Sequence, residues 1–216
     1  MAEDAGSSEG LIKYECSFTH NPELPYDVKE INAWRRVLYL LGILGQDPNR
    51  YGGCGYGNVS QRISGSQANK TWYIITGTQT DKIEYLTPHH YSLVTEYYPE
   101  ENRVVAEGPV EPSSECMTHG TIYDFCPDVK FVFHVHSPEI WKLAKELEIP
   151  LTSETAEHGT PEMAKETERL LKETDAAERG IIAMGRHEDG IISFGKTAEE
   201  AVFILVRHFV KSLQYR

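Results

Sequence analysis

Clusters of basic residues, long apolar runs and paired cysteine motifs are all missing from this 216-residue sequence. No apolar stretch approaches the roughly 18 residues that a membrane-spanning helix needs, so we expect no membrane partner. Aspartate and glutamate outnumber lysine and arginine, 33 to 21, and the formal net charge is −12. Nucleic-acid binding normally depends on a basic patch that releases phosphate counterions, so this charge argues against a nucleic-acid partner.

The four cysteines show neither CxxC spacing nor the density of a disulfide-stabilised domain. The first ten residues are small and acidic, and they have neither the basic nor the apolar region of a signal peptide. We therefore expect free thiols, a cytoplasmic location and a flexible tail at residues 1–10. The length is sufficient to bury a core, so we expect one domain over residues 1–216.

An apolar, β-forming run at residues 131–137 contains His134 and His136. Side chains alternate between the two faces of a strand, so both imidazoles should point to one face and Val135 to the other. Neutral imidazole is a good ligand for Zn²⁺, and a strand can hold two such ligands rigidly. Two packing histidines would show the same spacing, so the pair alone leaves both interpretations open.

Periodicity, capping residues and glycine turns predict interspersed helices and strands. Helices are expected over residues 27–45, 87–95, 111–125, 138–147, 159–173 and 197–213. Strands are expected over residues 59–63, 71–77, 103–107, 131–136, 180–185 and 191–194. Some links between strands are too short for a crossover helix. The expected fold is therefore α/β, with a mixed, largely antiparallel central sheet and helices on both faces.

A catalytic zinc site usually has three protein ligands and one open position, so a third ligand is needed. His187 is the best candidate, because it lies in a polar turn between two strands, with Gly185 and Gly190 on either side. His158, next to Gly159 at a helix start, is the alternative. The expected cofactor is Zn²⁺, and another divalent transition metal would also suit these ligands.

Glu115 is the candidate catalytic acid or base, because it lies at an expected helix N-terminus close in sequence to the histidine strand. A carboxylate beside a metal ion can move a proton next to a carbonyl group that the ion polarises. An ordinary first-turn glutamate that interacts with the helix dipole is the alternative. His119 should share the helix face of Glu115 and is interpreted as a packing or supporting residue.

Three short segments have the backbone amides, hydroxyls and side-chain amide that an anion site requires. They are a glycine-asparagine turn, a threonine-glycine turn and two serines at an expected helix N-terminus. Each is common alone, but all three accompany the candidate metal site. The candidate phosphate ligands are Gly57, Asn58, Thr76, Gly77, Ser113 and Ser114.

Taken in order, these motifs resemble the class II aldolase and adducin family, which includes fuculose-phosphate and rhamnulose-phosphate aldolases. The most specific part is a Pro-Ser-Ser-Glu motif followed at this distance by a His-x-His motif. The similarity runs from about Asp27 to Lys211. The segments that carry it are Gly57-Asn-Val-Ser60, Thr76-Gly77, Pro112-Ser-Ser-Glu115, His134-Val-His136, Gly159-Thr-Pro-Glu162 and His187 to Glu200.

The resemblance implies a three-layer α/β/α sandwich, assembled as a homotetramer with active sites at subunit interfaces. It implies that His134, His136 and His187 hold zinc, that Glu115 is the catalytic acid or base, and that the six candidate phosphate ligands bind the substrate. This chain departs from the family in reading His187-Glu-Asp-Gly190 where many members read His-Gly, and in a longer connection at residues 64–70. These changes leave the metal ligands in place and put the sugar specificity in question.

The function implied is reversible, zinc-dependent aldol cleavage of a phosphorylated ketose to dihydroxyacetone phosphate and an aldehyde. Sugar-phosphate epimerases and dehydratases use the same metal triad within this fold, so they are the first alternative. A non-catalytic scaffold like the head domain of adducin is the second alternative. That interpretation predicts loss of the ligands, whereas this sequence keeps three histidines and Glu115.

Overall fold

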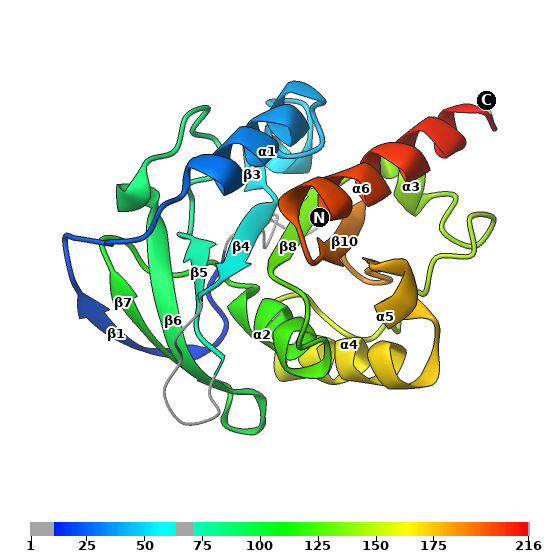
Figure 1. The fold of residues 1–216 in the computed structure, drawn as a ribbon. Helices are drawn as coiled ribbons and strands as arrows, with labels where there is room; N and C mark the ends of the chain where they lie inside the picture. Colours follow the sequence, from blue (N-terminus) through cyan, green and yellow to red (C-terminus); the bar gives the residue numbers. More distant parts are fainter. Residues whose placement is uncertain (1–10, 64–70, 216) are drawn as a thin grey trace, which may run out of the picture.

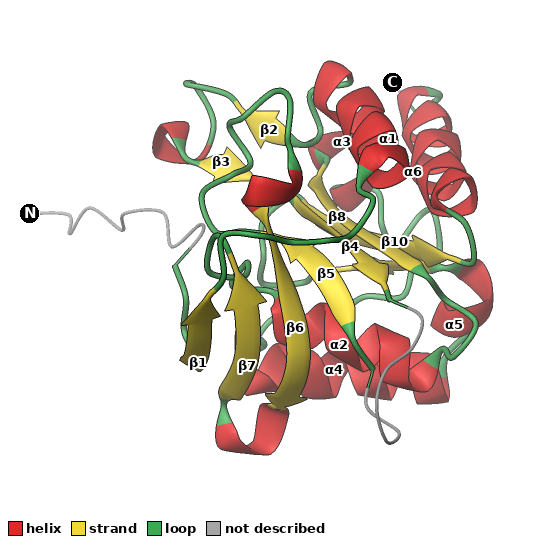
Figure 2. Ribbon diagram, turned by 60° about the vertical axis from the view of Figure 1, so that its left-hand side comes forward, coloured by secondary structure: helices red, strands yellow, loops and turns green. Residues whose placement is uncertain are grey.

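The computed structural model describes residues 11–63 and 71–215, which build a central sheet between two layers of helices (Figures 1 and 2). The main sheet contains β1 (Glu15–His20), β4 (Asn58–Arg62), β5 (Tyr73–Thr76), β6 (Tyr91–Tyr98), β7 (Arg103–Gly108), β8 (Phe131–His136), β9 (Ile181–Ala183) and β10 (Gly190–Gly195). The spatial order is β1-β7-β6-β5-β4-β8-β10-β9. β1 is parallel to β7, and the remaining neighbours pair antiparallel.

Helices cover both faces of this sheet, as the view in Figure 2 shows. One layer contains α1 (Lys29–Leu40), α3 (Pro138–Trp141) and α6 (Ala198–Leu213). The other contains α2 (Cys116–Phe125), α4 (Pro161–Glu173) and α5 (Ala176–Arg179). A small separate hairpin pairs β2 (Gly45–Gln46) with β3 (Gly55–Tyr56). The expected α/β fold, with its three layers and largely antiparallel sheet, is confirmed.

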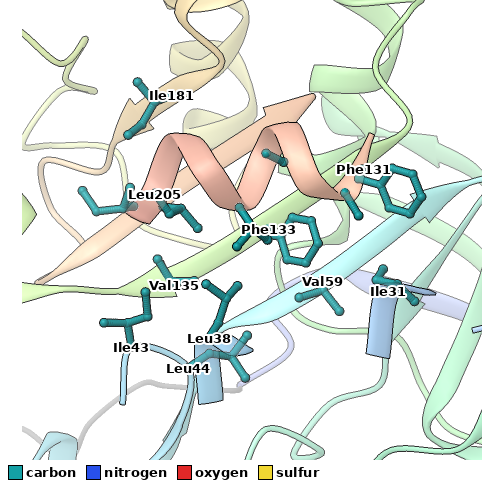
Figure 3. Packing of buried hydrophobic residues seen from close by; sticks show 14 of the residues in the cluster. Ile31, Leu38, Ile43, Leu44, Val59, Phe131, Phe133, Val135, Ile181 and Leu205 are labelled. Carbon is teal, nitrogen blue, oxygen red and sulfur yellow. The ribbon is translucent and has the colours of Figure 1, made fainter. Parts of the chain in front are cut away.

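Strand β8 is central to the sheet and is buried on both faces. Phe131, Phe133 and Val135 point into the core that also contains Leu38 of α1 and Leu205 of α6 (Figure 3). Full burial of one such side chain is worth about 1.5–3 kcal/mol, so these contacts fix the register of β8. The alternation that buries these three residues sends the intervening side chains to the opposite face.

The predicted helix at residues 87–95 is wrong. One 3-10 turn, Pro88–His90, is followed directly by strand β6. The proline and its preceding threonine start a helical turn, but the next eight residues are mostly aromatic or β-branched and favour a strand. β6 lies between β5 and β7, so pairing on both sides stabilises the extended conformation.

Several other boundaries differ from the expectation. Helix α1 ends at Leu40, before Gly42, whose φ of +71° is the left-handed conformation that commonly ends a helix. Helix α2 begins only at Cys116, after the two serines, and α3 stops at Trp141. The sequence pattern does not predict strand β1. The C-terminal helix begins as predicted, because Thr197 Oγ1 accepts a hydrogen bond from a backbone amide of the first turn.

The expected tail at residues 1–10 and the long connection at residues 64–70 lie outside the described residues. Among the helices of the described ranges, none combines the length and the apolar character that crossing a bilayer would require.

Candidate functional site

Three imidazole nitrogens converge on one point at the C-terminal end of the central strand β8. The Nε2 atoms of His134 and His136, on β8, lie 3.1 Å apart. Nε2 of His187, in the turn between β9 and β10, lies 3.0 Å from the His136 nitrogen and 3.2 Å from the His134 nitrogen. Nitrogens that bind one tetrahedral zinc ion at about 2.05 Å lie about 3.3 Å apart, so this triangle has the size of a metal site.

The protonation state of these rings also suits a metal. His134 Nδ1 lies 3.2 Å from the Ile191 carbonyl oxygen, which can only accept, so Nδ1 carries a proton and Nε2 is the nitrogen that faces the other two imidazoles. Burial, reinforced by the neighbouring imidazoles, holds the pKa values of His136 and His187 well below the ordinary value. Both rings are therefore neutral at pH 7, which is the form that binds a cation.

Glu115 completes this cluster from the N-cap position of α2. Its Oε2 lies 3.1 Å from His134 Nε2, and its Oε1 lies 3.7 Å from His187 Nε2. Asn58 Nδ2 donates a 2.8 Å hydrogen bond to Oε2. Oε1 is buried and has no hydrogen-bond partner within the described ranges. A buried, unsatisfied carboxylate oxygen beside three imidazole nitrogens fits a site that holds a cation.

The six candidate phosphate ligands lie on segments joined by hydrogen bonds around Glu115. Thr76 Oγ1 accepts from the Val59 amide at 3.1 Å, and the Ser113 amide donates to the Thr76 carbonyl at 3.1 Å. Gly77 forms an isolated bridge with Pro112. These links place the threonine-glycine turn beside the two serines. The Gly77 amide already donates to a backbone carbonyl, so the hydroxyls are the better donors for an anion.

Gly57 has a structural reason to be glycine, separate from any role with a ligand. Its φ is +84°, and a Cβ atom there would lie 2.8 Å from the His134 carbonyl oxygen. Close backbone approach to β8 therefore requires glycine at this position. Asn58 follows as the register partner of His134, which brings its amide to Glu115.

His158, the alternative third ligand, lies outside the group of candidate metal ligands. Its ring stacks on His187 with 4.1 Å between the centroids. The residues close enough to share one ion are His134, His136 and His187. His119 lies on α2 and Ser60 on β4, and Ser60 Oγ is 2.7 Å from His119 Nδ1. These contacts agree with the interpretation of His119 as a supporting residue.

Sequence reasoning missed two groups beside the site. Lys13 Nζ donates to the His158 carbonyl at 3.1 Å and lies 3.4 Å from His158 Nε2. Arg50 and Tyr51, from the glycine-rich loop, lie against His136. No local periodicity marks these residues, because each contact joins segments far apart in the chain.

A comparison with known families agrees with this geometry. The pattern of the family described as Class II Aldolase and Adducin N-terminal domain matches residues 49–208. The match covers well over half of the chain and includes the three histidines and Glu115. The chain therefore belongs to this family.

Solved structures with the same fold include sugar-phosphate enzymes. A sugar-phosphate aldolase from Thermotoga maritima superposes with a TM-score of 0.63 at 18% identity, covering 87% of this chain and 93% of that one. L-fuculose-1-phosphate aldolase from Thermus thermophilus superposes with a TM-score of 0.59 at 18% identity. The match covers 85% of this chain and 89% of that one. YgbL from Klebsiella pneumoniae, a candidate aldolase, epimerase or decarboxylase, superposes with a TM-score of 0.62 at 15% identity. The match covers 86% of each chain. At these identities the similarity establishes the fold.

Proposed function

We propose that this protein is a metal-dependent class II aldolase. It would cleave a phosphorylated ketose reversibly to dihydroxyacetone phosphate and an aldehyde. The observation that carries the proposal is the position of Glu115, whose Oε2 lies 3.1 Å from the nitrogen of one candidate metal ligand. A carboxylate at that distance from a metal site is placed to move a proton beside a carbonyl group.

The proposed metal is Zn²⁺ or another divalent transition ion, held by His134, His136 and His187. When bound, it would supply Lewis-acid polarisation of the substrate carbonyl. Glu115 would take the proton from the carbon next to that carbonyl in the synthesis direction and return it in the cleavage direction. Oε1 is the oxygen available for this proton, since Oε2 accepts from Asn58.

The substrate phosphate would bind to Asn58, Thr76, Ser113 and Ser114, close to the backbone of Gly57 and Gly77. Hydroxyl and amide donors are neutral, which is consistent with a chain of net charge −12 that has no basic cluster. Two of these donors, Ser113 and Ser114, directly precede the N-cap of α2. The positive end of that helix would favour an anion there.

The assembly we propose is a homotetramer with its active sites at subunit interfaces. Support comes from apolar side chains that the neighbouring helices α1 and α6 leave exposed, because exposed apolar surface commonly marks a protein interface. These side chains are Val37, Leu40, Phe203, Val210 and Leu213. Light scattering of the purified protein would measure the assembly directly.

Sugar-phosphate epimerases and dehydratases are the second candidate function, since a polarised carbonyl and a carboxylate base serve those reactions as well. The similarity to YgbL, whose description covers aldolase, epimerase and decarboxylase activities, favours keeping this candidate. A non-catalytic scaffold would not need a buried carboxylate beside three clustered imidazoles.

The proposal is tested by measuring, with proton NMR, how fast zinc-loaded protein exchanges the C–H proton of dihydroxyacetone phosphate for deuterium from the solvent. Wild type should exchange, Glu115→Gln should not, and the exposed neighbour variant Glu111→Gln should exchange like wild type. Equal exchange by wild type and Glu115→Gln would contradict the role of Glu115. No exchange by zinc-loaded wild type would contradict the aldolase. A screen of phosphorylated ketoses for cleavage would then identify the substrate.

A further inference from the structure

The unusual turn after His187 contains a buried carboxylate that is tied to a distant loop. Asp189 Oδ2 accepts a 2.6 Å hydrogen bond from the Tyr51 hydroxyl. Only 6% of Asp189 is exposed, and its Oδ1 is buried without a hydrogen-bond partner within the described ranges. A charge buried in this way is stable only when nearby donors compensate it. Tyr51 is one such donor.

Arg50 places a positive charge near the same carboxylate. Its Nη2 donates 2.7 Å to the Tyr51 hydroxyl oxygen and lies 3.7 Å from Asp189 Oδ2. The same nitrogen donates 3.2 Å to the carbonyl oxygen of His136. The guanidinium therefore joins the carboxylate of the turn, the phenol of the loop and the backbone of a metal-ligand residue. A planar group with several donors is suited to such a junction.

The ring of His136 is enclosed by the residues that this network holds. The Tyr51 ring meets it edge-on, with 4.8 Å between the centroids. The centroid of the Tyr56 ring lies 5.4 Å from that of His136, and the Tyr56 hydroxyl accepts a hydrogen bond from Arg50. An imidazole in contact with two aromatic rings loses freedom to rotate, so its nitrogen stays aimed at the metal position.

The turn is also attached to the histidine strand directly. The Asp189 carbonyl accepts a 2.8 Å hydrogen bond from the Ser137 amide, and Gly190 is the register partner of His136. The φ of Asp189 is +64°, an uncommon conformation for a residue with a side chain. Backbone strain of this kind persists only where the surroundings impose it. Asp189 thus connects the turn that carries His187 to Tyr51 and Arg50, the residues that contact His136.

We propose that Asp189, Tyr51 and Arg50 form a positioning network that holds His136 and His187 in the geometry of the metal site. None of the three is a metal ligand in this arrangement. The inference rests on the proposed metal site and extends it to residues that the candidate ligand set does not include. Residues of this kind behind metal ligands typically contribute about 10–100-fold to metal affinity.

Titration of chelator-treated, full-length protein with Co²⁺ alone tests the network. The visible absorption of bound Co²⁺ reports the coordination geometry, independently of any activity. Tyr51→Phe and Asp189→Asn should each weaken Co²⁺ binding about tenfold or more and change the spectrum. The double variant should bind Co²⁺ with about the affinity of the single variant that binds it less tightly, because both substitutions interrupt the same chain of hydrogen bonds.

Tyr97→Phe and Asp124→Asn are the matched controls. Their phenol and carboxylate also form a hydrogen bond, but on β6 and α2, away from the three histidines. They should leave Co²⁺ affinity and spectrum unchanged, and the thermal stability of all metal-free variants is measured beside them. Unchanged Co²⁺ binding in Tyr51→Phe and Asp189→Asn would overturn the network, as would an equal loss in the controls. Absence of Co²⁺ binding by wild type would overturn the metal site itself.

Discussion

The Asn58 side chain donates a 2.8 Å hydrogen bond to the same oxygen of Glu115 that lies 3.1 Å from His134 Nε2. Asn58 is opposite His134 in the pairing of β4 with β8. The carboxylate is therefore oriented by β4, the strand that neighbours β8, and its position relative to the three histidines does not depend on a flexible loop. A single donor in a buried position carries much of this orientation.

We expect Asn58→Ala to lower kcat for dihydroxyacetone phosphate proton exchange by about 10–100-fold, with zinc content retained, whereas loss of a phosphate contact alone would raise KM. The physical reason is that Glu115 loses the donor that orients it, while all three histidines remain. Asn32→Ala is the matched control, because Asn32 also donates a partly buried hydrogen bond, 2.9 Å to the Leu86 carbonyl, outside the site. If Asn58→Ala exchanges protons at the wild-type rate, the orienting role assigned to Asn58 is wrong.

His187 and His158 should differ sharply in metal binding. His187→Ala removes the nitrogen of a proposed metal ligand. It should abolish stoichiometric zinc, a greater loss than the roughly 10–100-fold that a residue hydrogen-bonded to a ligand contributes. His158→Phe keeps a flat ring stacked on His187 and should retain one zinc per chain. Zinc content after dialysis, measured by atomic absorption, distinguishes them. Loss of zinc in His158→Phe together with retention of zinc in His187→Ala would mean that His158, and not His187, is the third metal ligand.

The histidine pair and its strand could be predicted from the sequence because their signals are local. Phe131, Phe133 and Val135 share one face of the strand, and a period of two places both imidazoles on the other face. His187 could be found because glycines on both sides mark a turn between strands. Thr197 could be found because its capping signal is contained within four residues.

The remaining features depend on contacts between distant segments. The capping signal at Thr87 favours a helix over residues 87–95. The pairing of β6 with a strand on each side favours the extended conformation, which the structure shows. Lys13 and His158 are 145 residues apart, and Arg50 and His136 are 86 apart. Such contacts follow from the tertiary arrangement of the sheet, which neither periodicity nor turn chemistry encodes.

Gly190→Ala should disturb His187 and with it the metal site. A Cβ atom there would lie 2.8 Å from Cδ2 of His187 and 3.0 Å from its carbonyl oxygen. We expect a loss of about 1–3 kcal/mol in the free energy of unfolding of the metal-free protein, typical of overpacking, and a clear loss of zinc affinity. Urea unfolding and zinc titration measure the two effects separately.

Gly120→Ala is the control for this crowding. Its Cβ atom would lie 2.5 Å from two atoms of the Tyr97 ring, so it should also lower the free energy of unfolding. It touches none of the three histidines and should keep its zinc affinity. Equal losses of affinity in the two variants would mean that Gly190 acts through general stability and not through His187.

His119 should make the metal-free protein less stable in acid. Burial, together with the nearby charge of His134 when protonated, lowers the pKa of His119 to about 3. Its Nδ1 lies 2.7 Å from Ser60 Oγ, and its Nε2 is buried with no hydrogen-bond partner in the parts of the chain that the structure describes. A second proton on this ring would have no acceptor, so the folded state favours the neutral form.

The direction of the effect follows from proton uptake. An unfolded histidine has a pKa of about 6.5, so between that value and about 3 the unfolded state binds a proton that the folded state does not. Stability from this group is fully present above pH 6.5 and falls as the pH is lowered. At pH 5 the difference of about 1.5 units corresponds to about 2 kcal/mol. His119→Gln, which can still bond to Ser60, should remove this contribution. Urea unfolding of chelator-treated wild type and variant at pH 7 and pH 5 measures it, and an equal pH dependence in both proteins would contradict the assignment.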